Sequence, residues 1–179
     1  MDQEWRRTID RRAARIMNRL QTENTREAFQ FWLDIVQSGV YPTRADVTPH
    51  SLRKVLPNLI LIEVLRDPLD FRYRLVGTKV DYFVGTHFTD LRFSEIEHQA
   101  EGSNIFATHA ELVEKGVPMC GQIPYIGPFA DIRDIRDIML PLFDADGNVT
   151  HILNALDFPL KSQVRKMSAR ATEKQLRAE

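Results

Sequence analysis

The sequence predicts an α+β protein built on one five-stranded antiparallel sheet, with a helical extension at each end of the chain. Two strand-like segments occur early in the chain and three occur late. The segments between these groups have helix-capping residues and helically spaced apolar residues. Helices that stand between groups of antiparallel strands are typical of the α+β class. A chain of 179 residues, 43% of them hydrophobic, is expected to bury one core.

Charge divides the chain into three parts. The formal net charge is -1, but both ends are rich in Arg and Lys, so the body between them is acidic. We expect an N-terminal amphipathic helix over residues 1–22, a central domain over 23–159 and a basic C-terminal helix over 160–179. A net charge near zero disfavours attraction of the whole protein to nucleic acid or to an anionic membrane.

Composition also indicates the compartment. Cys120 is the single cysteine, which excludes an internal disulfide and fits a reducing environment. No apolar run is long enough to cross a bilayer, and the N-terminus "MDQEWRRTIDRR" has no apolar signal core. We therefore expect a cytoplasmic protein.

The first helices are predicted from spacing and capping residues. In the N-terminal helix, apolar residues recur every three or four positions: Trp5, Ile9, Ala13, Ile16 and Leu20. Asn24 and Glu27 form a capping-box pattern that predicts the start of a second helix, which Gly39 ends. Thr48 predicts the cap of a short third helix that ends at Pro57.

Two strands follow, "NLILIEVL" and "FRYRLV", joined by the turn "DPLD" as a predicted hairpin. In the second strand, Phe71, Tyr73 and Leu75 alternate with Arg72 and Arg74. Alternation places the two arginines on the opposite side from the apolar residues. We expect them to be solvated and to bind no anionic ligand.

The second half of the chain predicts helices and then three strands. Ser94 and Glu97 form another capping-box pattern, and Ser103 predicts the cap of the helix "NIFATHAELVEK", which Gly116 ends. The three strands are "PMCGQIPYI", "DIMLPLF" and "VTHILNALDF", and the turn "DADG" joins the last two. The repeat-like segment "DIRDIRDI" is interpreted as a charged connector that enters the strand at Ile138.

A loop for binding phosphate is not present between Gly77 and Gly85. A phosphate loop ends in Gly-Lys-Ser or Gly-Lys-Thr, whereas "GTKVDYFVG" places Thr before Lys and then becomes apolar. The two glycines are interpreted as turn and cap positions.

The segment "FRYRLVGTKVDYFVGTHFTDL" resembles the early core of a PAS domain, and "IMLPLFDADGNVTHILNALDF" resembles its last hairpin. With "FWLDIVQSGVYPTRADVTPHSLRKVLPNLILIEV", the chain is similar to short stand-alone PAS-like proteins of alphaproteobacteria. The resemblance covers most of the chain. It implies a five-stranded antiparallel sheet with helices over one face, which together form a cup, and a bacterial sensory or interaction module.

The resemblance also implies where a ligand would bind. With strand alternation and helix facing, it places seven residues on or near the inner cup: Tyr73, Phe83, Phe88, Phe106, His109, Met119 and Tyr125. In haem-binding PAS proteins the axial histidine comes from the helix that holds His109, so haem stays open as an alternative, although a lone histidine is more often a wall residue. Cys120 does not stand in the helix motif of flavin photoreceptors, so flavin photochemistry is not expected, and we interpret it as a small buried side chain. No metal spacing is found among the histidines.

The main functional hypothesis is a PAS-type regulator that binds a small ligand in the cup and signals by contact with another protein. The alternatives are an interaction or dimerisation module without a ligand and, third, a small-molecule enzyme on the same cup. No nucleophile–base pair or paired-carboxylate motif is present, so we expect no enzyme. Aromatic filling of the cup is the commoner arrangement in proteins.

The helical extensions predict a homodimer. A second stripe in the C-terminal segment is formed by Leu160, Val164, Met167 and Ala171. Each amphipathic extension needs a surface for its apolar side, either on its own domain or on another chain. PAS domains commonly dimerise through flanking helices, so the resemblance implies a homodimer to which the N-terminal helix contributes.

Overall fold

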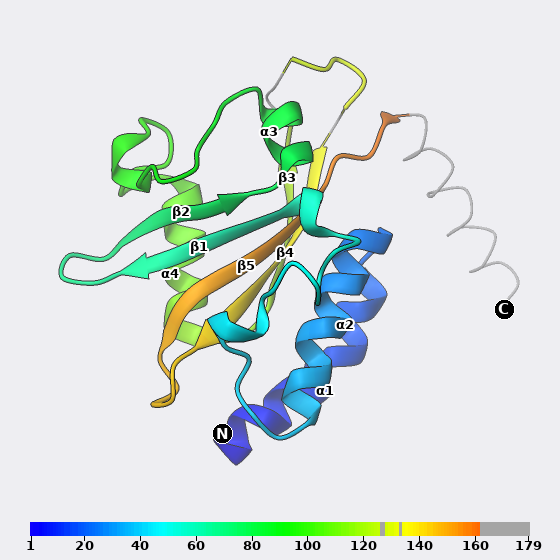
Figure 1. The fold of residues 1–179 in the computed structure, drawn as a ribbon, viewed down its shortest axis with the longest axis vertical. Helices are drawn as coiled ribbons and strands as arrows, with labels where there is room; N and C mark the ends of the chain where they lie inside the picture. Colours follow the sequence, from blue (N-terminus) through cyan, green and yellow to red (C-terminus); the bar gives the residue numbers. More distant parts are fainter. Residues whose placement is uncertain (126–127, 133, 162–179) are drawn as a thin grey trace, which may run out of the picture.

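In the computed structural model the chain forms one antiparallel sheet with helices on both of its faces (Figure 1). The structure describes residues 1–125, 128–132 and 134–161. The helices are α1 (Gln3–Arg19), α2 (Glu23–Gln37), α3 (Thr78–Val84) and α4 (Asn104–Lys115), with short 3-10 segments η1 (Arg44–Asp46), η2 (Leu56–Asn58) and η3 (Phe93–Glu95). The strands are β1 (Leu59–Leu65), β2 (Asp70–Val76), β3 (Met119–Pro124), β4 (Asp134–Phe143) and β5 (Val149–Asp157).

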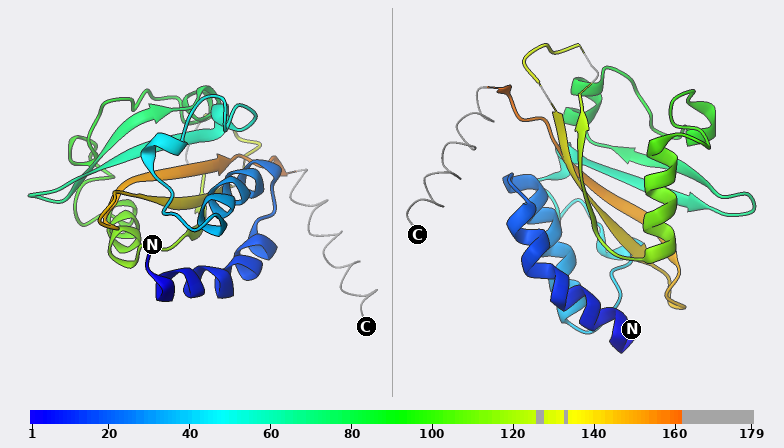
Figure 2. Two further views of the ribbon diagram at one scale, coloured as in Figure 1. Left: turned by 60° about the horizontal axis from the view of Figure 1, so that its bottom comes forward. Right: turned by 180° about the vertical axis from the view of Figure 1, so that it is seen from behind.

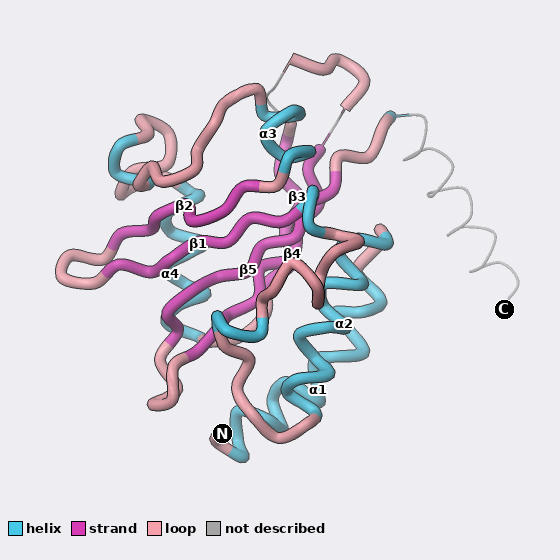
Figure 3. Tube along the Cα trace, viewed as in Figure 1, coloured by secondary structure: helices cyan, strands magenta, loops and turns pink. Residues whose placement is uncertain are grey.

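The strands lie side by side in the order β2-β1-β5-β4-β3 (Figure 3). All four neighbouring pairs are antiparallel, and the two hairpins β1–β2 and β4–β5 meet at the centre of the sheet. Two strands, then helices, then three strands is the predicted order, and the predicted α+β class with a five-stranded antiparallel sheet is confirmed within the described residues.

The cross-strand register defines two faces of the sheet. Ile62 lies opposite both Tyr73 and Ile152, so these three side chains share one face, here called the inner face. Leu153 lies opposite both Leu61 and Leu140 on the other face, here called the outer face. α4 lies against the inner face, and α2 lies on the opposite side of the sheet (Figures 1 and 2).

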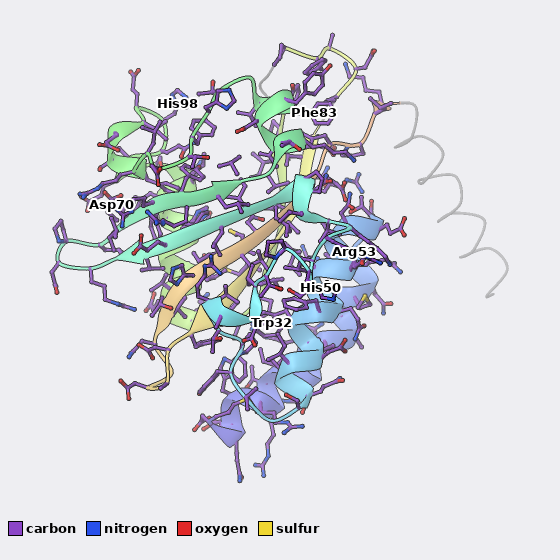
Figure 4. All side chains as sticks on the ribbon, in the orientation of Figure 1. Trp32, His50, Arg53, Asp70, Phe83 and His98 are labelled. Carbon is purple, nitrogen blue, oxygen red and sulfur yellow. The ribbon has the colours of Figure 1, made fainter. Side chains whose placement is uncertain are left out.

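On the outer face, α2 is anchored by Trp32, which is fully buried between the helix and the sheet (Figure 4). Its indole nitrogen donates a hydrogen bond to the Pro141 carbonyl oxygen at 2.8 Å. α1 packs beside α2, and the predicted stripe is covered within the same chain, because Ile9, Ile16 and Leu20 are buried. The apolar side of α1 therefore packs against its own domain and not against another chain.

Three predicted helix boundaries are wrong. α2 begins at Glu23 after Thr22, and the Asn24 side chain does not cap it but donates to Asp157 at 2.6 Å. The short helix predicted after Thr48 is a series of turns. Pro57 lies inside η2 and does not end a helix.

Ser94 does not cap a helix either. Its hydroxyl donates to the Asp70 carboxylate at 2.7 Å. Asp70 is buried at the start of β2, and a buried carboxylate requires hydrogen-bond donors. The 3-10 segment η3 therefore begins after Arg92, whose backbone amide donates to Glu95.

The helix that forms the wall of the inner face is confirmed at both ends. The Ser103 hydroxyl accepts a hydrogen bond from the Phe106 amide at 3.1 Å, and α4 ends at Gly116, which has a φ of 58°. The left-handed conformation at this position favours glycine. Gly85 ends α3 in the same way, with a φ of 74°.

Two strand predictions need correction. The register of β2 shifts between Leu61 and Ile62, which leaves Arg74 without an opposite residue and places Leu75 opposite Leu61, away from Tyr73. β4 begins at Asp134, so "DIRDIRDI" is not only a connector: its second half is strand. The period of three hid the strand because Asp134 and Asp137 are acidic yet buried.

The ends of the chain are described unequally. Leu160 forms an isolated bridge with Ile132, whereas the rest of the predicted C-terminal stripe, Val164, Met167 and Ala171, lies outside the described residues. None of the helices in the described part combines the length and the apolar character that crossing a bilayer requires.

Candidate functional site

The inner face carries two buried polar side chains on neighbouring strands, Asp137 of β4 and Asn154 of β5. Their residues are 3% and 6% exposed. The Asn154 amide donates to Asp137 Oδ2 at 3.4 Å. The register places both on the face of Met139, Ile152 and Tyr73, since Asn154 lies opposite Met139 and Asp137 is two residues before it. We call these two side chains the Asp137–Asn154 pair.

Gly121 of β3 lies opposite Asp137 and allows the carboxylate its position. A Cβ atom at Gly121 would lie 2.1 Å from Asp137 Oδ1, which no side chain could tolerate without moving the carboxylate. Glycine in a strand interior often marks a place where another group approaches the backbone closely. Here that group is the Asp137 carboxylate.

One oxygen of each member of the pair has no hydrogen-bond partner among the described residues: Asp137 Oδ1 and Asn154 Oδ1. Burial raises the pKa of Asp137 to about 6, against the opposing effects of the Asn154 side chain and of the backbone amides of Gly121 and Asp137. A buried polar atom without a partner costs about 1–3 kcal/mol. The pair is therefore expensive for the fold as it stands.

His109 of α4 supplies a third such atom. Its Nδ1 lies 2.8 Å from the Ile105 carbonyl oxygen, so Nδ1 carries the proton and donates. Its Nε2 is buried and has no partner among the described residues. Burial lowers the pKa of His109 to about 4, so the ring is neutral at pH 7 and Nε2 is an acceptor.

An aromatic cluster surrounds His109 at the β2 side of the inner face. Ring centroids of Phe71 and Phe93 lie 5.4 and 4.9 Å from the imidazole, and Phe106 contacts Phe71 at 5.2 Å. Tyr73 stacks on Phe88 at 5.2 Å. The Tyr73 hydroxyl donates to Gln99 at 2.7 Å, and burial raises its pKa.

A second aromatic cluster lies at the α3 end. Phe83 stacks on Phe158 at 4.7 Å and meets Phe129 edge-on at 5.4 Å. Tyr125 donates its hydroxyl hydrogen to the Phe83 carbonyl oxygen. Figure 4 shows Phe83 on α3 and Asp70 at the other end of β2.

The seven predicted cup residues thus divide into two groups. Four of them form or border the first cluster: Tyr73, Phe88, Phe106 and His109. Phe83 and Tyr125 belong to the second. Met119 lies apart at the start of β3, opposite Met139. All seven side chains are buried or half-buried, but their role in binding stays a prediction.

Asp137, Asn154 and Gly121 are not among the site residues that the sequence predicts. The sequence places Asp137 in a charged connector and indicates only a strand at Asn154. The signal that was available is the polar residue inside the apolar run "ILNALDF", because a buried strand rarely holds an amide without a reason.

Haem does not fit the surroundings of His109. A haem iron would need Nε2 to face a space wide enough for the porphyrin. The imidazole is instead enclosed by Phe71 and Phe93, and the residue is 7% exposed. In the part of the chain that the structure describes, no three His, Cys, Asp or Glu side chains lie close enough together to hold a metal ion.

The two arginines of β2 face away from Tyr73, but they are not simply solvated. Arg72 donates twice to Glu63 Oε2, at 2.9 and 2.6 Å, and its side chain is 30% exposed. Arg74 is 44% exposed and lies 3.3 Å from Asp90. Their predicted lack of a role in ligand binding stays untested.

Cys120 lies beside α1 in a surface hollow of about 300 Å³ that Arg12, Arg15 and Arg19 also line. The thiol is partly buried, and burial raises its pKa although Arg19 acts in the opposite direction. A raised pKa keeps the sulfur protonated and weakly reactive, as expected for a packing residue.

Comparisons with known proteins give one family and several solved structures. The PAS domain family matches residues 20–157. No curated protein sequence matches the chain. An RNA-binding light-oxygen-voltage receptor is similar in structure with 12% identity and a TM-score of 0.45, over 76% of this chain and 42% of the receptor. This chain thus spans less than half the length of that receptor.

Two further structures are light-oxygen-voltage domains. One, studied with a flavin analogue, has 12% identity and a TM-score of 0.44, over 70% of this chain and 93% of its own. The other is the light state of the blue-light photoreceptor aureochrome1, with 10% identity and a TM-score of 0.38, over 70% and 99%.

Proposed function

This chain belongs to the PAS domain family, and on that premise we propose that it is a cytoplasmic sensor that binds a small molecule at the inner face and signals through contact with another protein. PAS domains are commonly sensory or signalling modules, and the residues matched by the family include the whole sheet. The sensor has no catalytic role in this proposal.

The observation that carries the proposal is the set of buried polar atoms without partners: Asp137 Oδ1, Asn154 Oδ1 and His109 Nε2. Asp137 and Asn154 lie on the inner face of the sheet, and His109 lies on α4, the helix that packs against that face. Small-molecule sites are mostly apolar and aromatic with a few polar groups of this kind. A ligand that bonds to them offsets the cost of their burial.

The route from the inner face to the surface follows α4. The wall helix holds His109 in its middle and ends at Gly116, whose carbonyl oxygen accepts a hydrogen bond from the Trp5 indole at 2.7 Å. A ligand that shifts α4 would therefore also shift α1. The outer side of α1 carries Arg7, Arg11 and Arg15, which are exposed to solvent. We propose that a partner protein reads this change.

An interaction module without a ligand is the second candidate, and the first aromatic cluster favours it. Tyr73 is buried and its hydroxyl is satisfied by Gln99, so the β2 side of the inner face is already filled. In this case the polar atoms would bind ordered water, as buried polar groups often do.

Native mass spectrometry of the purified chain, followed by extraction of bound small molecules, tests the proposal. The matched variant is Asn154→Leu, which keeps the shape and removes the amide, and Glu101→Gln on the surface is the control. We expect a bound mass in the unmodified chain and in Glu101→Gln but not in Asn154→Leu. If all three chains carry no ligand and a metabolite panel raises the melting temperature of none, the protein is an interaction module.

A further inference from the structure

The Asp137–Asn154 pair offers acceptors but no free donor on its unpartnered side. Asp137 Oδ1 is a carboxylate oxygen and Asn154 Oδ1 is an amide oxygen, and neither has a partner among the described residues. The Asn154 amide nitrogen, which could have donated, is directed to Asp137 Oδ2. A molecule bound here must therefore supply hydrogen atoms.

The charge at the pair also lacks compensation. Asp137 forms no ion pair within the parts of the chain that the structure describes, although its residue is 3% exposed. Cys120 on β3, whose thiol is protonated at pH 7, interacts with Asp137, and His109 on α4, the helix that packs against the same face of the sheet, is neutral. A buried carboxylate without a cation is costly, so a cationic donor would gain the most at this position.

We propose that the ligand presents two adjacent N–H donors, as an amidine, a guanidine or a protonated amino-heterocycle does, and that Asp137 and Asn154 each accept one hydrogen bond from it. The inference rests on the proposed sensor function and names the chemical class of its ligand. An amidinium or guanidinium group holds its N–H donors in a fixed planar fork, which suits two neighbouring oxygen acceptors.

The donor class decides between ligands of the same shape. A carboxylate such as benzoate would place acceptors against two acceptors and a like charge against Asp137. Benzamidine has the same ring and size but presents N–H groups and a positive charge. Benzamidine and benzoate therefore form a matched pair of probes that differ in the property at issue.

The test is calorimetric titration of the full chain with benzamidine and with benzoate at pH 7.5. We expect benzamidine to bind in the millimolar range and benzoate not to bind. Asp137→Asn and Asn154→Leu should each weaken benzamidine binding by about tenfold, which corresponds to about 1.4 kcal/mol. Glu101→Gln should leave it unchanged. The melting temperature of each variant, measured beside the titration, shows whether a loss of binding is due to unfolding.

The outcomes separate this inference from the sensor function. If benzoate, or a neutral metabolite, binds and Asn154→Leu abolishes that binding, the sensor function stands and the donor class is wrong. If benzamidine binds equally to all variants, its site lies elsewhere and the inference is overturned. If no probe and no metabolite binds, and a crystal structure shows ordered water on both oxygens, both proposals fail.

Discussion

The indole nitrogen of Trp5 donates a hydrogen bond to the Gly116 carbonyl oxygen at 2.7 Å. The bond joins the first helix of the chain to the C-cap residue of the wall helix α4, across 111 positions of sequence. The same indole meets the rings of Tyr41 and Phe143 at centroid distances of 5.1 and 5.3 Å. Trp5 therefore fixes α1 to the sheet and to α4 at once.

Replacing Trp5 with Phe tests this connection. The variant keeps most of the ring contacts but removes the N–H donor and leaves the Gly116 carbonyl without that partner. We expect a loss of about 1 kcal/mol in the free energy of unfolding, measured with urea. Arg7→Ala, on the exposed side of α1, is the control and should change stability by less than about 0.5 kcal/mol. Equal effects of the two variants would show that the bond adds no stability.

The predicted homodimer can be tested on the exposed side of α1, because the apolar side is covered within the chain. Ala14 lies in the middle of that exposed side. If α1 contributes to a two-fold contact, Ala14→Arg brings two further charges together across it and should convert a dimer into a monomer in multi-angle light scattering. The unfolding transition should stay unchanged. A monomeric mass for the unmodified chain would contradict the homodimer directly.

The sequence predicted most of the fold because its strands and its wall helix have strong local signals. Ser103 and Gly116 bound α4 by capping chemistry that acts within one turn. The central strands carry buried apolar residues on both faces of the sheet, such as Ile62 on the inner face and Leu153 on the outer face. This pattern is expected for strands that are covered on both sides. At Asn24 and Ser94 a capping pattern alone predicted a helix start. In the structure each of these side chains instead forms a hydrogen bond with a residue distant in sequence.

The polar part of the site could not be predicted in the same way. Asp137 and Asn154 are 17 positions apart and meet only because β4 and β5 pair in one register. The space for the carboxylate depends on Gly121 of a third strand. Nothing local in "DIRDIRDI" distinguishes the buried aspartate from an exposed one, because the burial of Asp137 depends on how β3, β4 and β5 pair.

The pKa of Asp137 predicts how stability changes between pH 4 and pH 7. Its ordinary value is 3.8 and its value in the fold is about 6, because burial penalises the charged form. The folded protein therefore binds this proton more tightly than the unfolded chain, so the group destabilises the fold above pH 6, and the penalty disappears as the pH falls to about 4. Asp137→Asn should be more stable than the unmodified chain by up to about 3 kcal/mol at pH 7.

Urea unfolding of both chains at pH 4 and pH 7 measures this difference. The advantage of Asp137→Asn should shrink towards zero at pH 4, because the carboxyl is then protonated in both the folded and the unfolded states. An advantage of the same size at both pH values would mean that the charge of Asp137 is not its cause.

His109 predicts the opposite pH dependence over nearly the same range. Burial lowers its pKa from 6.5 to about 4, so the unfolded chain takes up a proton that the folded protein refuses. Stability contributed by the neutral ring is therefore complete above pH 6.5 and is lost as the pH falls towards 4, by up to about 3 kcal/mol. The two trends oppose each other in the unmodified chain, so its stability alone would conceal both.

We expect the two pH dependences to separate when His109→Gln is compared with its parent in an Asp137→Asn background. The parent should lose stability between pH 6.5 and pH 4, and the double variant should lose less by the contribution of His109, while Asp157 and His151 titrate alike in both chains. If the two profiles run parallel, His109 is not held neutral by its enclosure between Phe71 and Phe93.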